Sequence, residues 1–142
     1  MNHATVAIPP NDRRLSLGGV ALNAHWFLRA GLASVLLFHG VGKLADVTGF
    51  ASMMDLSVPV VWLVTLAEVG GGLAILIGAF GRDWLTRLGA AVNIPVLLGA
   101  IYLVHWGQWS FVASESHPLG GMEFQVVLLL IASYLVAKGN EA

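Results

Sequence analysis

The sequence has no cysteine among its 142 residues. This absence excludes a disulfide framework, a thiol relay within the chain, cysteine-ligated iron–sulfur centres and covalently attached c-type haem. Any redox chemistry of this protein therefore depends on a bound cofactor or on a partner.

Charge is also scarce. Asp, Glu, Lys and Arg make up 11% of the chain, the formal net charge is -1, and no run of basic residues occurs. Proteins that bind nucleic acid normally carry a basic face, so nucleic acid is excluded as a partner. Hydrophobic residues make up 57% of the chain, which leaves too little polar surface for an ordinary soluble domain of this size. The composition predicts an integral membrane protein, with the lipid bilayer as its first partner.

Apolar segments cover most of the chain, at about 24–45, 58–80, 84–106 and 119–138. Each is close to the roughly 20 residues that a membrane-spanning helix needs. Residues 1–23 are polar, and we expect a short tail there. A cleaved signal peptide is not expected, because the next segment contains Arg29 and no clear small-x-small cleavage site follows. The fold class is therefore all-α: one domain, residues 24–138, forms an antiparallel up-down bundle of four transmembrane helices, and 139–142 are a C-terminal tail.

The connections predict how this bundle lies in the membrane. Residues 81–83 form so short a connection that the helices on either side must be antiparallel neighbours, and Arg82 and Arg87 flank it. Lys and Arg gather on the cytoplasmic side, whereas the connection 107–118 contains neither. We expect a multi-pass protein of the cell inner (plasma) membrane with both termini cytoplasmic, and with the first and third connections outside.

Small residues and a proline predict how the helices pack. Gly70, Ala74 and Gly78 recur every four positions, which is the small-xxx-small pattern of close helix contact. Packing roles are expected for four glycines, Gly40, Gly71, Gly72 and Gly78. Pro95 removes a hydrogen bond inside the third segment, so a kink is expected there, with Asn93 bonding to freed backbone groups.

One helical stripe of the first segment contains residues that recur at steps of three and four: Arg29, Leu32, Leu36, His39 and Lys43. It carries every ionisable group between residues 29 and 45. A charged side chain at bilayer depth costs about 2.5–3.5 kcal/mol, so this stripe should face protein. Other segments supply further ionisable groups, Glu68, His105 and Glu123. The predicted topology brings these groups into the outer half of the bundle. They form either a structural ion-pair network or a polar pocket, open to the outside, that binds a ligand head group or relays protons.

The histidines differ in their expected roles. His39 is followed by Gly40 and Gly42, which leave room beside its ring, and a ligand-contacting or proton-accepting imidazole is as well supported as a packing histidine. His105 stands beside Trp106 near the membrane interface, which favours a solvated histidine. The remaining histidines have no spacing typical of a metal site, and no metal is expected.

Several motifs stand out together: Arg29, FHGVGKL at 38–44, GF at 49–50, AEVGGGLAILIGAFGR at 67–82, His105 and Glu123. Over residues 29–139 these motifs resemble the DoxX family of small four-helix membrane proteins. The resemblance implies roles for the positions that match its motif: Arg29, His39, Gly40, Lys43, Glu68, Gly71, Gly72, Gly78, His105 and Glu123. Some members of this family are subunits of a thiosulfate:quinone oxidoreductase of sulfur oxidation, and many relatives have no assigned activity.

The resemblance and the polar groups together predict a quinone-linked redox subunit or accessory, which acts with a partner redox subunit or as a homo-oligomer. Whether the chain is an enzyme by itself stays open. Lys43 and His39 are expected to bond to the oxygens of a quinone head group, while Glu68 and Glu123 exchange protons with the outer aqueous phase. The expected catalytic residues are Glu68, His39 and Glu123, and the expected ligand-binding residues are Arg29, Lys43 and His105.

Other functions stay open at this point. Buried acid–base clusters also mark a proton-coupled small-molecule transporter or binding protein. A haem b anchor would use His39 and His105 as axial ligands. A structural subunit of a membrane complex would need the charges only for insertion. The connection 107–118 is longer and more polar than a minimal one, and we expect a partner subunit to dock there.

Overall fold

The computed structural model describes residues 24–141, and the predicted polar tail at 1–23 lies outside the described residues. The elements, in chain order, are α2 His25–Ala45, α3 Val47–Met53, α4 Val58–Gly78, α5 Asp83–Ala91, α6 Ile94–Ala100, the π-helix η1 Ile101–His105, α7 Glu123–Lys138 and the 3₁₀-helix η2 Gly139–Glu141.

The described part of the chain contains four helical stretches long and apolar enough to span a membrane: His25–Ala45, Val58–Gly78, Asp83–His105 and Glu123–Glu141. Much of their apolar surface faces outward, as at Phe38, which is 77% exposed, and Leu130, which is 64% exposed. Such a surface suits lipid as the surrounding solvent. The prediction of an all-α bundle of four long apolar helices is confirmed, and the chain is a multi-pass membrane protein.

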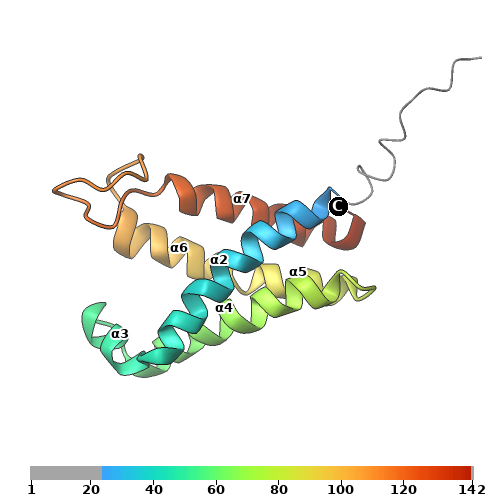
Figure 1. The fold of residues 1–142 in the computed structure, drawn as a ribbon, viewed down its shortest axis with the longest axis horizontal. Helices are drawn as coiled ribbons and strands as arrows, with labels where there is room; N and C mark the ends of the chain where they lie inside the picture. The colour runs from blue at the N-terminus through green and yellow to red at the C-terminus, as the bar shows by residue number, and fades with distance from the viewer. Residues whose placement is uncertain (1–23, 142) are drawn as a thin grey trace, which may run out of the picture.

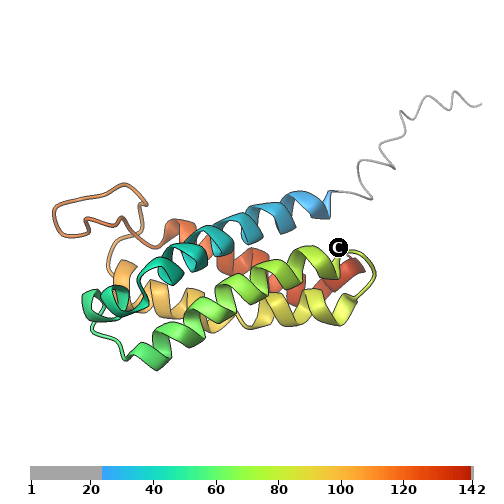
Figure 2. The same cartoon turned by 60° about the horizontal axis from the view of Figure 1, so that its bottom comes forward.

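Successive spans run in opposite directions (Figure 1). The start of α2 lies with the α4–α5 connection and η2 at one end of the bundle, called here the η2 end (Figures 1 and 2). The short helix α3 and the connection 106–122 lie at the opposite end, called here the α3 end. Which of these ends faces the cytoplasm stays a prediction.

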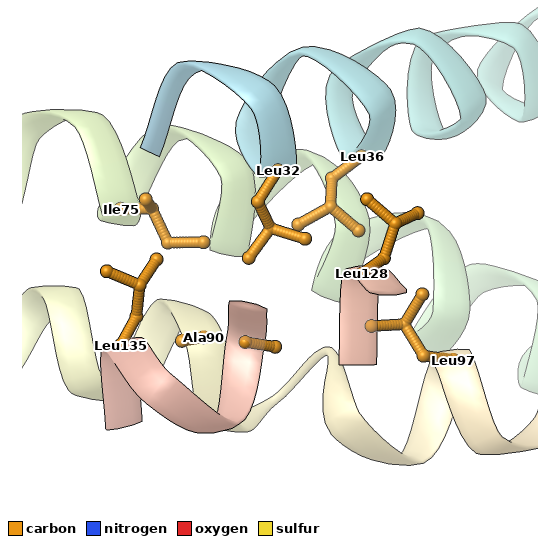
Figure 3. Close-up of a cluster of buried hydrophobic side chains, with 8 residues drawn as sticks. Leu32, Leu36, Ile75, Ala90, Leu97, Leu128 and Leu135 are labelled. Atoms are coloured by element: carbon orange, nitrogen blue, oxygen red, sulfur yellow. The ribbon is translucent and has the colours of Figure 1, made fainter. Parts of the chain in front are cut away.

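The apolar core lies between the two ends and takes side chains from every span (Figure 3). Its members are Leu32, Leu36, Ile75, Ala90, Leu97, Leu128, Ala132 and Leu135. In lipid, burying such side chains brings little hydrophobic gain, so close packing contributes most of the stabilisation. A second cluster, Val47, Ala51 and Val61, fastens α3 to the start of α4.

Glycines let the backbones of α4 and α5 approach closely. A Cβ added at Gly71 would lie 2.7 Å from the carbonyl oxygen of Gly89, and one added at Gly78 would lie 2.5 Å from the amide nitrogen of Thr86. On the other side of α4, a Cβ at Gly72 would lie 3.0 Å from Leu37 Cγ. The prediction of a close contact at Gly70 is wrong, because no described atom of another helix lies within 4 Å of a Cβ added there.

The third span is broken between α5 and α6, and the predicted kink is confirmed. The amide N–H of Asn93 donates to Ala90 O, three residues back, which leaves Gly89 O free. The Asn93 side chain takes this carbonyl at 2.9 Å and also donates to Ala67 O of α4 at 2.9 Å. The break therefore stays hydrogen-bonded inside the bundle, as irregular backbone at membrane depth must.

Candidate functional site

The centre of the candidate site is an ion pair between Lys43, in the last turn of α2, and Glu68, in the middle of α4. Lys43 Nζ lies 2.7 Å from Glu68 Oε2 and 2.8 Å from Oε1, and the two side chains are 10% and 8% exposed. Gly40 makes this pairing possible. A Cβ added at Gly40 would lie 3.0 Å from Glu68 Cβ, so α2 reaches α4 here only without a side chain.

The helix α3 covers the charge of Lys43. Asp46 begins this helix by accepting a hydrogen bond from Gly49 N at 2.8 Å, a side-chain N-cap. Phe50 then lies with its ring centroid 5.0 Å from Lys43 Nζ, within reach of a cation–π interaction. The third N–H of the ammonium has only a long contact, 3.5 Å to His39 O. Lys43 therefore keeps one donor weakly used.

A second polar pair joins η1 to α7. His105 Nδ1 lies 2.9 Å from Gly120 O, and because a carbonyl only accepts, Nδ1 carries the proton of the neutral ring. His105 Nε2 then accepts from Gln125 Nε2 at 2.9 Å. The Oε1 atom of Gln125 is buried and has no hydrogen-bond partner among the described residues. His105 is only 9% exposed, so the interpretation as a solvated interfacial histidine is wrong.

The two polar pairs line one cavity of about 210 Å³ between α2, α4, α6, η1 and α7. Its polar members are His39, Lys43, Glu68, His105 and Gln125. The core residues Leu36, Leu97 and Leu128 line its apolar floor. A concave apolar site with a few convergent polar groups is the usual form of a small-molecule site.

The sequence model of the DoxX family matches residues 24–106, which run from the start of α2 to the end of η1. The chain belongs to the DoxX family. The matched residues include both members of the Lys43–Glu68 pair and His105, whereas α7 with Gln125 and Glu123 follows the match. No curated protein and no solved structure matches this DoxX chain.

The DoxX fold thus brings four of the predicted site residues together, Lys43, Glu68, His39 and His105. His39 is at the edge of this group, because its residue is exposed and its ring meets that of Phe38 edge-on at 5.5 Å. Of the two glycines that follow His39, Gly40 packs against α4, whereas Gly42 faces open space.

Arg29 lies elsewhere. Its buried guanidinium is at the η2 end, where it donates to Ile75 O at 3.1 Å and Thr86 Oγ1 at 2.8 Å. It also donates to Gly139 O and Asn140 Oδ1, both at 2.9 Å. Arg29 and Lys43 share one stripe of α2, but at about 1.5 Å per residue they are about 21 Å apart along the helix. The stripe therefore serves two separate groups of partners.

Glu123 does not line the cavity either. Its Oε2 accepts a hydrogen bond from Phe111 N at 3.2 Å and so fastens the connection 106–122 to the first turn of α7. The same connection is held by backbone bonds from Gly121 N to Ser110 O and from Met122 N to Gln108 O. In this structure the Glu123 carboxylate shapes the connection rather than the cavity.

Sequence reasoning missed Gln125, which lines the cavity and bonds to His105. Its signal in the sequence is weak, because one uncharged amide within an apolar helix changes the hydropathy little. The π-helical turn of η1 was also not expected, although such turns often occur at functional sites. It ends at His105.

As axial haem ligands the two histidines are poorly matched. Both ring nitrogens of His105 are engaged, with Gly120 O and with Gln125, so ligation through Nε2 would require the loss of the Gln125 bond. His39 lines the same cavity, but it is an exposed residue at the edge of that cavity.

Proposed function

We propose that this DoxX protein is a quinone-linked subunit or accessory of a membrane oxidoreductase, and that the cavity between the two polar pairs binds the quinone head group. The observation that supports the proposal is that each polar pair offers both a donor and an acceptor. Lys43 and Glu68 do so on one side of the cavity, and on the other side the Gln125 amide has an Oε1 atom that is buried and has no partner among the described residues.

This arrangement suits a ligand whose oxygens change their hydrogen bonding. Quinone carbonyls only accept, whereas quinol hydroxyls also donate. The second N–H of Gln125 serves a carbonyl, and its Oε1 serves a hydroxyl. On the other side of the cavity, the ammonium of Lys43 serves a carbonyl and the carboxylate of Glu68 serves a hydroxyl. The volume of about 210 Å³ is below the roughly 300–1,000 Å³ of sites for drug-sized ligands, and it fits one small ring.

Protons and electrons take different routes in this proposal. A quinone becomes a quinol by gaining two electrons and two protons. Glu68 lies beside the ring oxygens and holds or releases a proton, and His39 at the exposed rim passes it to the aqueous side. The electrons come from a partner redox subunit, for which the connection 107–118 remains the expected docking segment. Shortening residues 110–116 should leave the bundle folded and lose that partner.

Purification in mild detergent, followed by mass spectrometry of the extract, tests the first step by asking whether a quinone accompanies the protein. Equilibrium dialysis with a tailless benzoquinone measures the head-group site itself. Gln125→Leu should weaken this binding by about twofold to tenfold, because a hydrogen bond contributes about 0.5–1.5 kcal/mol.

The matched control is Thr65→Val, which removes another buried polar group. Thr65 Oγ1 donates to Val61 O at 2.7 Å and does not line the cavity, so this variant should bind as the parent does. Absence of saturable quinone binding by the parent protein contradicts the proposal, and so does equal loss of binding in both variants.

A further inference from the structure

A second cavity lies on the other side of the Lys43–Glu68 pair. It has a volume of about 280 Å³, and its walls are α4 and α6. Apart from Lys43 and Glu68, the described side chains that line it are apolar, such as Val64, Val96 and Leu103. The second cavity is therefore a site for an apolar group rather than for another polar head.

The break in the third span explains why this space exists. Before the break, Gly71 and Gly89 hold α5 tightly against α4. After Asn93 and Pro95, α6 leaves α4, and the two helices diverge toward the α3 end (Figure 1). The side chains between them are small. At Gly99 no atom of the described residues lies within 4 Å of an added Cβ, so this position faces open space.

The second cavity opens toward the lipid. Two residues of its wall, Val60 on α4 and Leu103 in η1, are 42% and 56% exposed, and both belong to membrane-spanning segments. Pro95, Gly99 and Leu103 follow one another at steps of four residues and mark an edge about 12 Å long on the third span. An extended chain can lie along this edge.

The two cavities share a boundary. The residues that line both of them are Lys43, Phe50, Met54, Glu68, Val96, Ala100 and Val104. Lys43 and Glu68 are held by their ion pair, so Met54, with its flexible unbranched side chain, adapts more readily than they do to a chain passing beside it. A ligand with its ring in the first cavity thus has its substituent next to the second.

We infer that the second cavity holds the isoprenoid tail of the quinone, which enters sideways from the bilayer between α4 and α6. The inference rests on the proposed function, because it assigns the tail of the same ligand. It adds Gly99 as the residue that leaves room for the tail.

The test uses a benzoquinone whose tail ends in a photoreactive diazirine, bound to the full-length protein in lipid nanodiscs. Illumination should label peptides containing residues 60–64, whose lining members belong to the second cavity and not to the first, as well as 95–104. Excess quinone with an unlabelled tail should remove the label. Gly99→Leu fills the tail space and should reduce labelling about tenfold, which corresponds to about 1.4 kcal/mol of lost tail packing.

The matched control is Gly70→Leu, the same substitution at an exposed position of α4 with open space around it and outside both cavities. It should label as the parent does. All three proteins should bind the tailless quinone equally, because Gly99 does not line the first cavity.

The outcomes separate the two proposals. If the tailless quinone binds but the label appears on other helices, or persists in Gly99→Leu, the tail site is wrong and the head-group site stands. Label at this site that excess tailed quinone does not remove indicates a lipid acyl chain, which also overturns the inference. Failure of the parent to bind the tailless quinone overturns the proposed function, and the tail assignment with it.

Discussion

Removing one member of the Lys43–Glu68 pair should destabilise the bundle strongly, and removing both should restore it. The two side chains are 10% and 8% exposed and share two short contacts, so a single substitution leaves one charge buried without its partner. Breaking a buried pair in this way costs about 3–5 kcal/mol, whereas replacing the whole pair by apolar groups is often neutral. We expect a loss of about 3 kcal/mol for Glu68→Gln and for Lys43→Met.

The double variant should return to within about 1 kcal/mol of the parent, because neither charge is left unpaired. Equilibrium unfolding in mixed micelles with an increasing fraction of denaturing detergent, followed by circular dichroism, measures each free energy of unfolding. Lys138→Met is the control, since Lys138 is exposed in the last turn of α7 and should change stability by less than about 0.5 kcal/mol.

Additive losses in the double variant would refute the reasoning, because they would show that the two side chains do not act on each other. Another result would separate structure from function. If Glu68→Gln keeps its stability but loses quinone binding or quinone reduction, and Lys43→Met restores nothing, Glu68 serves the ligand. Three proteins that match the parent in both stability and binding would exclude either role.

Three further outcomes are expected. Arg29→Lys should cost about 3 kcal/mol in the same unfolding assay, because one ammonium cannot reach all the acceptors of a guanidinium. The affinity for the tailless quinone should stay unchanged. A loss of affinity without a loss of stability would show that Arg29 contacts the ligand. Glu123→Ala should cost about 1 kcal/mol and speed proteolysis of the connection 107–118 without altering quinone affinity; weaker binding would make Glu123 a site residue. Reporters fused after Arg82 and at the C-terminus should behave as cytoplasmic and reporters within 107–118 as external; an external C-terminus would reverse the predicted orientation.

The membrane itself explains why the ionisable groups were expected to face one another inside the bundle. Charges at bilayer depth need partners, and the topology left few partners for Glu68. The same reasoning failed to separate Arg29 from Lys43, because it considered the stripe that they share and not their separation along the helix. Arg29 bonds instead to backbone carbonyls and neutral side chains, which carry no distinct sequence signal.

Packing details were harder to predict than charges. Glycines stand on more than one face of α4, and spacing alone did not show that Gly71, rather than Gly70, meets α5. The burial of His105 inside the bundle was also not predicted. Its burial depends on the π-helical turn and on a bond to Gly120 in the following connection, and neither follows from local sequence. Gln125 was missed for the same reason, because it belongs to the site through its bond to His105.

The hydrogen bonds of Arg29 form with residues that are synthesised much later than Arg29 itself. Its acceptors at Ile75 and Thr86 are synthesised 46 and 57 residues after it, and those at Gly139 and Asn140 follow 110 and 111 residues after it. The first span therefore enters the bilayer with a cation whose final partners do not yet exist. Each later span supplies some of the hydrogen-bond acceptors of this guanidinium. A nascent chain that ends before Gly139 therefore keeps a charge within the membrane whose hydrogen bonds are incomplete.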